Sequence, residues 1–312
     1  MRENIEQFSI MEDQDMLQKI MDIAAKCRPN ECYGNTFYIL LKKLAIRHLP
    51  VLEHGNAVFE VSREIYKNFR DLMQAMDEHD VYSRFRFTDF DGRYLMSGTF
   101  RDWYLLACQL YADDQKRVMA RCGFDIVNES VGHVLDNFLD KADRLAVAGI
   151  KAAEPGCLTE KECLSHARLT VRFIVSRDMS REFLKFREAS IDEVPYPLPF
   201  IDPLFFSGRP GEHAIDEHLD ATVTWEAVTG QAKKAYHRFM ELGMTTEIGT
   251  PLMSAFSVVP GSAGTELYMT ANLDHWQHIF RKAADQYAAY EMRDLMAQVS
   301  QCVYEKYPFM KM

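Results

Sequence analysis

The chain has 312 residues, 47% of them hydrophobic and 12% aromatic, which is ample for one large packed domain or two ordinary ones. Its formal net charge of −10 argues against a general nucleic-acid binder, because a phosphate backbone requires a basic face. A single nucleotide needs only a few local cations, so a nucleotide ligand stays open.

Two further features concern the compartment. The N-terminal segment 1–15 is polar and acidic, without the apolar stretch of a secretory signal, and no apolar run approaches the ~20 residues of a membrane span. The seven cysteines are an odd number without a C-x-x-C pair, which favours a reducing compartment and argues against a zinc site. We therefore expect a cytoplasmic protein that binds no metal.

Hydrophobic periodicity predicts a chain that mixes helices with short strands. Helices are expected over 12–28, 36–48, 99–110, 113–121, 127–150 and 221–243, with two more in series over 272–307. Strands are expected over 57–61, 94–97 and 265–271. The proline-rich segment 194–211 cannot form regular structure, because proline lacks the backbone donor.

The most informative stretch is 166–193, HARLTVRFIVSRDMSREFLKFREASIDE. Apolar residues alternate from Leu169 to Val175, the pattern of a strand with one well-buried face. Asp178 is expected to cap a following helix that ends near Lys185 and Arg187. Cations at a helix end either balance the helix dipole or bind an anionic ligand, and both interpretations stay open here.

Two internal similarities appear along the chain. The segment YLMSGTFRDW (94–103) resembles LYMTANLDHW (267–276), and VFEVSRE (58–64) resembles RFIVSRD (172–178). The preferred explanation is that capped strand-to-helix units look alike. The alternative is internal duplication, although short similarities at unequal spacing do not indicate a solenoid.

The residues after the 166–193 strand resemble a family signature. The segment K-F-R-E-A-S-I-D-E (185–193) is similar to the first half of R-H-R-x-x-S-x-N-E-x-S-x-R-Y, the motif of the flavin-dependent thymidylate synthases. Lys185 and Phe186 stand where that motif has its first arginine and its histidine, whereas Arg187 is kept. The S-x-R-Y tail is replaced by Pro195–Leu198.

The resemblance extends over most of the chain. R-H-L-P-V-L-E-H (47–54) is similar to the family's G-H-x-S-x-x-E-H flavin element, and AFSVVPGSAGTELYMTANLDHWQHIF (255–280) resembles its C-terminal motifs. YLMSGTFRDWYLLACQLY (94–111) looks like the strand–helix unit that the long bacterial and phage branch inserts. The order and spacing of these segments carry the resemblance.

The resemblance implies an α+β fold, a twisted, mainly antiparallel sheet flanked by helices, forming a single domain over 1–312 with an insert at about 65–165. It implies a homotetramer with FAD sites where subunits meet, and NADPH and methylenetetrahydrofolate as co-substrates. It leaves the catalytic residue unknown. The implied cofactor-binding residues are His48, Glu53, Lys185, Arg187, Glu193, Asn272 and His278. The implied substrate-binding residues are Ser190, Arg187 and Arg281.

Several arginines expected for nucleotide binding are replaced. Phe256, Ala283 and Pro197 occupy such positions, and Arg281 is near enough to substitute for one if the helix register shifts. Each lost charge-assisted contact typically costs ~1.5–3 kcal/mol, so several losses would weaken dUMP binding by orders of magnitude.

Three functions therefore compete. The first is a divergent enzyme that transfers a methylene group to C5 of a pyrimidine nucleotide, dUMP or a relative, and reduces it. The second is a flavoenzyme of the same fold with a less anionic substrate. The third is a non-catalytic oligomer that keeps the fold and a flavin or nucleotide. Bound FAD separates the first two from the third.

Overall fold

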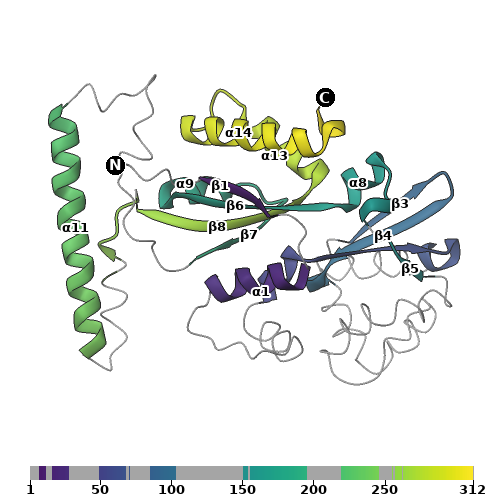
Figure 1. The fold of residues 1–312 in the computed structure, drawn as a ribbon, viewed down its shortest axis with the longest axis horizontal. Helices are drawn as coiled ribbons and strands as arrows, with labels where there is room; N and C mark the ends of the chain where they lie inside the picture. The colour runs from purple at the N-terminus through teal and green to yellow at the C-terminus, as the bar shows by residue number, and fades with distance from the viewer. Residues whose placement is uncertain are drawn as a thin grey trace.

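The computed structural model describes residues 7–11, 16–27, 49–67, 70, 85–102, 150–153, 155–194, 219–245, 255, 257–261 and 263–311. Within these ranges the chain forms two four-stranded antiparallel sheets with helices packed on them (Figure 1). The expected α+β class, with antiparallel sheets flanked by helices, is confirmed. None of the helices described combines the length and apolar character that crossing a bilayer requires.

The first sheet, which we call sheet A, has the strand order β1-β6-β8-β7. Its strands are β1 (Phe8–Met11), β6 (Arg168–Ser176), β7 (Ser190–Glu193) and β8 (Gly264–Asn272). The central pair β6 and β8 runs in register from Arg168 opposite Asn272 to Ser176 opposite Gly264. The β1 strand is supplied from the N-terminus, far from its neighbour in sequence, and pairs Phe8 with Phe173.

The second sheet, sheet B, has the order β3-β4-β2-β5. Its strands are β2 (Asn56–Val61), β3 (Arg86–Phe90), β4 (Arg93–Thr99) and β5 (Ile150–Ala152). The β3–β4 hairpin turns through Asp91 and Gly92, both with positive φ (53° and 82°). A two-residue turn of this kind matches the twist of the flanking strands, and Asp-Gly is a favoured sequence for it.

One face of sheet A is apolar and covered by three helices. These are α9 (Arg177–Phe183), α13 (Leu273–Ala283) and α14 (Tyr290–Lys306) (Figure 1). The inward residues of β6 from Leu169 to Val175 pack there with Trp276, which is fully buried and donates its Nε1–H to the carbonyl of Leu169 at 3.0 Å. Burial of this face, at roughly 25 cal/mol per Å² of apolar surface, is the main attachment of the helices to the sheet.

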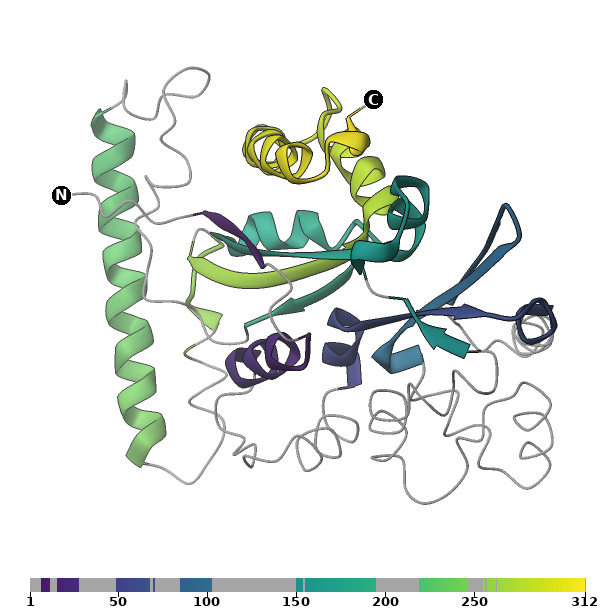
Figure 2. The same ribbon diagram turned by 45° about the vertical axis from the view of Figure 1, so that its right-hand side comes forward.

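The opposite face of sheet A is polar and is covered differently. Helix α1 (Met16–Cys27) and the short 3₁₀ segment η1 (Leu49–His54) lie on this side of the sheet (Figure 2). They pack against it through an apolar patch around Ile23, Leu52 and Tyr268. Beside that patch, the side chains that β6, β7 and β8 present are mostly hydroxyl-bearing or charged. This face therefore provides room for a polar site that the helical face does not.

Helix α8 (Glu160–His166) joins the two sheets. It begins with a capping box in which Thr159 and Glu162 bond each other's backbone N–H groups. His166 at its end is fully buried, with Nδ1 2.8 Å from the Ser97 hydroxyl and Nε2 2.6 Å from the Thr88 hydroxyl of sheet B.

A second contact between the sheets involves Arg86 on β3. Its guanidinium donates to Asp274 at 2.5 Å, to His275 Nε2 at 2.6 Å and to the Ser165 carbonyl at 3.3 Å. Sheet B is therefore held to the N-terminus of α13 by a charged clamp as well as by α8.

Most predicted elements appear where they were expected, including α1, β2, β4, β8, α11 (Leu219–Thr245), α13 and α14. The helix after β6 was predicted wrongly at both ends. It ends at Phe183, so Lys185 and Arg187 lie in the following turn, and its N-cap is Ser176, which accepts from Met179 N, rather than Asp178. The predicted helices over 36–48 and 113–121 lie outside the described residues, as does the one over 127–150 apart from Ile150, which begins β5.

Replacing His166 by Gln should change how stability depends on pH. Burial, and then the Arg86 charge, lower the pKa of His166 to about 4. Between pH 6.5 and 4 the unfolded chain therefore binds a proton at this residue that the folded chain excludes, so wild-type stability falls as pH falls through that window. The stability difference between wild type and variant should shrink by up to about 1.4 kcal/mol per pH unit there.

Urea unfolding at pH 7.5, 6 and 5 measures this difference. A gap between wild type and H166Q that stays constant from pH 7.5 to 5 would contradict the buried, neutral state of His166.

Candidate functional site

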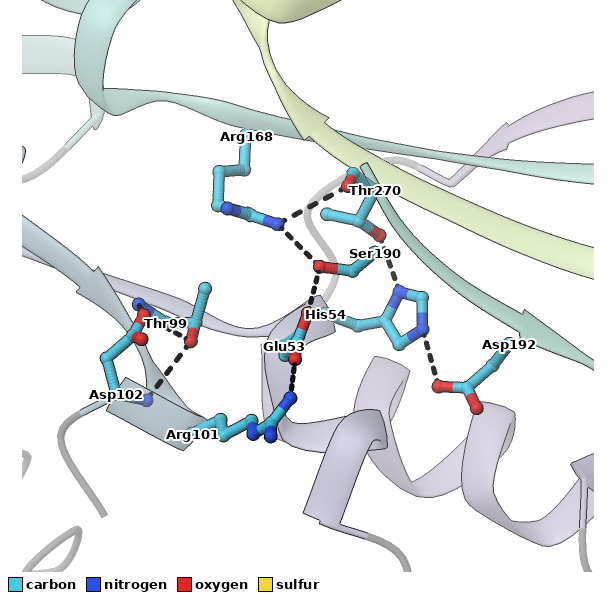
Figure 3. Close-up of polar contacts among 9 residues, drawn as sticks. All are labelled: Glu53, His54, Thr99, Arg101, Asp102, Arg168, Ser190, Asp192 and Thr270. Atoms are coloured by element: carbon cyan, nitrogen blue, oxygen red, sulfur yellow. Dashed lines mark hydrogen bonds and ion pairs between the residues drawn. The ribbon is translucent and has the colours of Figure 1, made fainter. Parts of the chain in front are cut away.

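The candidate site lies where η1 meets the polar face of sheet A (Figure 3). Consecutive residues Glu53 and His54, at the end of η1, are 5% and 0% exposed and reach the strands β7 and β8. A buried carboxylate and a buried imidazole are costly unless their polar atoms are paired. Every other feature of the site follows from how these two side chains are satisfied.

His54 is bound on both ring nitrogens. Its Nδ1 lies 2.6 Å from Thr270 Oγ1, and its Nε2 lies 3.0 Å from Asp192 Oδ2. Burial lowers the pKa of His54, and Asp192 opposes this only in part, so the ring is neutral near pH 7. Since a carboxylate can only accept, the network assigns the proton to Nε2 and leaves Nδ1 to accept from Thr270. Thr170 lies 2.7 Å beyond Thr270 and continues the chain of hydroxyls.

Glu53 is bound from two sides. Ser190 donates its hydroxyl to Oε2 at 2.6 Å, and the guanidinium of Arg101 forms an ion pair with Oε1. Arg101 reaches this position because Thr99 caps the helical turn that follows β4. The Thr99 N–H and hydroxyl donate to Asp102 Oδ2 at 2.7 and 2.5 Å, and the Asp102 N–H donates back to the Thr99 hydroxyl at 3.2 Å.

Arg168, the first residue of β6, crosses the polar face of the sheet. It donates to Asn272 Oδ1 at 3.1 Å. It also donates to Ser190 Oγ at 3.1 Å and to the Thr270 carbonyl at 3.3 Å (Figure 3). Asn272 is held in turn by donating its amide to the Ser165 carbonyl at 2.7 Å. The result is a continuous network from Asn272 through Arg168 and Ser190 to Glu53.

The structure thus brings together three of the residues expected from the sequence, Glu53, Ser190 and Asn272. The others lie elsewhere. Lys185 and Arg187 are exposed in the turn after α9, where Lys185 pairs with Glu182 at 2.5 Å. Along α13, Arg281 is exposed and His278 lies 3.5 Å from Glu188. Glu193, on β7, accepts from Ser180 at 3.2 Å, and His48 lies outside the described residues.

Two of the replaced family cations have a structural explanation, the motif histidine at Phe186 and the arginine at Ala283. Phe186 and Ala283 are buried in the apolar core, at 7% and 0% exposure. A cation there would need its own buried partners, so these substitutions are accounted for by core packing. Phe256 and Pro197 lie outside the described residues.

Comparison with known families decides the identity of this half of the chain. Residues 159–309 match the family model described as thymidylate synthase complementing protein. This segment belongs to that family. The resemblance to flavin-dependent thymidylate synthases is thereby confirmed, and with it a thymidylate synthase-like, flavin-dependent type of function. No curated protein matches the chain.

The family match covers Arg168, Ser190, Asp192 and Asn272. The other residues of the site precede the first matched residue, 159. Glu53, His54 and Arg101 come from the first third of the chain. Sequence reasoning missed Arg101, Arg168 and Thr270 as site residues. The only signal for Arg101 was its place in the segment 94–103, which resembles 267–276.

Chemically, the site offers donors rather than metal ligands. Within the described ranges no group of three or more histidine, cysteine or acidic side chains is arranged to hold a metal ion. Two guanidinium groups and a serine hydroxyl lie beside two carboxylates and a neutral imidazole. Such a set binds carbonyl or phosphate oxygens through arginine and positions a proton through the histidine.

Replacing Arg101 by Ala should destabilise the protein by about 1–3 kcal/mol, because the Glu53 carboxylate stays buried after losing its ion-pair partner. The matched control is R181A, which removes an exposed ion pair with Asp178 at 3.4 Å and should cost no more than about 1 kcal/mol. Urea unfolding at pH 7 measures both. Equal losses in the two variants would contradict a buried role for the Arg101–Glu53 pair.

Proposed function

We propose that this protein is a flavoenzyme of the thymidylate synthase type that binds FAD and acts at C5 of a pyrimidine nucleotide, dUMP or a relative. The observation that carries the proposal is the buried network Arg101–Glu53–Ser190–Arg168 on the polar face of sheet A. It is built partly from the segment that matches the family and partly from the first third of the chain. Glu53, Ser190 and Asn272 are the binding residues that this network supports.

The donor set suits an anionic, oxygen-rich ligand such as FAD or a nucleotide. Arg101 is the clearest indication, because its side chain is 37% exposed and its Nε is buried without a hydrogen-bond partner among the described residues. A buried N–H of this kind is costly, and an acceptor oxygen of a ligand would satisfy it. The ion pair with Glu53 holds the guanidinium at the edge of the site.

When bound and reduced, the flavin would supply the hydride that reduces the transferred carbon. The chain's own residues then have three roles in the proposal. Arg101 and Arg168 hold and polarise carbonyl or phosphate oxygens, an effect that preorganised charges exert strongly in a dry site. Ser190, held by Glu53 and Arg168, fixes ligand orientation. His54 is kept neutral and directed by Asp192, so it is available to accept or relay a proton.

The carbon donor and the reductant belong to the same proposal. Methylenetetrahydrofolate would supply the methylene group and NADPH would reduce the flavin. His48, Lys185, Arg187 and Arg281 remain proposed ligand contacts on the family resemblance alone. A less anionic substrate is not favoured, because Phe186 and Ala283 are core residues rather than part of a pocket.

We also propose that the protein works as a homo-oligomer, as the family resemblance implies. Helix α11 supports this, because it lies apart from the sheets in both views (Figures 1 and 2) and exposes Val223, Val228 and Leu242. A second copy of the chain is the proposed occupant of this surface. Sedimentation at micromolar concentration tests it, and a monomer would contradict it.

The first test is whether the purified protein carries or takes up FAD, read from its absorption spectrum and from the cofactor released on denaturation. About stoichiometric FAD, followed by saturable dUMP binding in calorimetry, is the expected result. Replacing Ser190 by Ala should weaken this dUMP binding about tenfold, because one hydrogen bond beside the ligand is lost.

The matched control is S300A, which removes an exposed hydroxyl on α14 and should leave binding unchanged. A colourless protein that takes up no added FAD would contradict the proposed function and leave a non-catalytic scaffold.

A further inference from the structure

The two sheets have the same connectivity. Reading sheet A as β1-β6-β8-β7 and sheet B in reverse as β5-β2-β4-β3, each has a long antiparallel central pair, an edge strand beside its first member and another beside its second. In both, the edge strand beside the second member lies between the two central strands in the chain, as β7 lies between β6 and β8 and β3 lies between β2 and β4. β6 thus corresponds to β2, β8 to β4, β7 to β3 and β1 to β5.

Register extends this correspondence to single residues. Thr270 pairs with Thr170 and with Ser190, whereas Ser97 pairs with Val58 and with Arg86. If Thr270 corresponds to Ser97, then Asp192 corresponds to Thr88. Asp192 lies two residues after Ser190, the partner of Thr270, and Thr88 lies two residues after Arg86, the partner of Ser97. The similar segments 94–103 and 267–276 align Ser97 with Thr270 as well, so this similarity agrees with the register. The other similarity, 58–64 with 172–178, is shifted by two residues, because the register matches Val58 with Thr170.

The two buried histidines make equivalent contacts, His54 with side chains of sheet A and His166 with side chains of sheet B. His54 Nδ1 contacts the Thr270 hydroxyl and its Nε2 contacts Asp192. His166 Nδ1 contacts the Ser97 hydroxyl and its Nε2 contacts Thr88. Each histidine precedes the first central strand of its own sheet and binds the corresponding hydroxyl of the other sheet.

Two further contacts repeat. The Leu273 N–H donates to the Ala167 carbonyl at 3.1 Å, and the Phe100 N–H donates to the Gly55 carbonyl at 3.2 Å. Across each central pair lies one ion pair with its charges exchanged. These pairs are Arg172–Glu266 at 2.7 Å in sheet A and Glu60–Arg93 at 2.9 Å in sheet B.

We propose that the chain is a tandem pair of one structural unit, the first beginning at β1 and the second at β5, and that each unit completes the other's site. The exchange includes the edge strands, because β1 of the first unit pairs with β6 of the second and β5 of the second pairs with β2 of the first. In this organisation the segment 65–165, which was expected to be an insert, comprises the rest of the first unit and the start of the second, with the boundary at β5. The family match, 159–309, covers the second unit from Thr159 onward and leaves out β5.

The two sites between the units have diverged. Around His54 the chain places Glu53, Arg101 and Asp192. The corresponding positions around His166 are Ser165, Asp274 and Thr88. There the guanidinium of Arg86 already donates to Asp274, to His275 and to the Ser165 carbonyl, so the charges of Arg86 and Asp274 are paired within the protein. Resting on the proposed function, the inference is that one chain binds one FAD, at the His54 site, while the His166 site is structural.

Exchanging Asp192 and Thr88 tests the correspondence without any ligand. Because Thr88 already satisfies His166 at 2.6 Å, D192T should keep the His54 contact and the thermal stability of wild type. D192V has the same shape without an acceptor and leaves a buried N–H unpaired, so its Tm should be lower by roughly 4 °C or more. Equal Tm values for the two variants would overturn the correspondence.

The reverse exchange, T88D, places a carboxylate on His166 Nε2, beside Arg86, Glu162, Asp274 and Ser97. The pKa of His166 should rise from about 4 by roughly one unit or more, because the added negative charge favours the protonated ring. NMR would detect this as a new histidine titration. T88N, which adds an amide without charge, is the control and should show no such rise. A T88D protein without the new titration would also overturn the correspondence.

Equilibrium dialysis with FAD tests the asymmetry. Wild type should bind one FAD per chain, D192T should bind it at least tenfold more weakly, and T88D should bind it as wild type does. Two FAD per chain, or weakened binding in T88D, would overturn the assignment of the His166 site as structural. No FAD binding would overturn the proposed function and the asymmetry, while the Tm and titration results still decide the duplication.

Discussion

The structure depends on the burial of two neighbouring polar residues, Glu53 and His54, against the polar face of a sheet. Neither side chain is tolerable in that environment alone, and both draw their partners from distant parts of the chain. Ser190, Thr270 and Asp192 come from sheet A, and Arg101 comes from the turn after β4. The need to satisfy this pair therefore fixes η1, β7, β8 and the end of β4 relative to one another. It also concentrates hydrogen-bond donors where an anionic ligand can use them.

Local patterns predicted the fold well where one face of an element is buried. Alternation from Leu169 to Val175 identified β6, and helical periodicity identified α1, α13 and α14. Elements without such a pattern were missed: β1, β5 and β7 are short, and their pairing partners are remote in sequence. The short elements β3 and α8 were not predicted either. The helix after β6 was extended too far because Phe186 is apolar; it is buried in the core from a turn, not from the helix.

The site was half predictable for the same reason. Motif similarity located Glu53, Ser190 and Asn272, because these residues lie in segments with a family signature. Arg101 and Arg168 carry no local signature, and only three-dimensional proximity shows that they supply positive charge in a chain of net charge −10. The family cations at Phe186 and Ala283 have become core residues. A count of motif arginines therefore underestimated the positive charge around the site, because it left out arginines that lie outside the motifs.

The pairing of β1 with β6 has a consequence for how the protein is made. Phe8 is synthesised well before its partner Phe173, which lies 165 residues (173 − 8) further along the chain. Until then β1 is an unpaired strand, and such edges invite association with other chains. Contacts this distant in sequence also close slowly, since a long loop must be ordered first. β1 therefore cannot take its place in sheet A until β6 has been synthesised, and it is the strand of this sheet that waits longest for its partner.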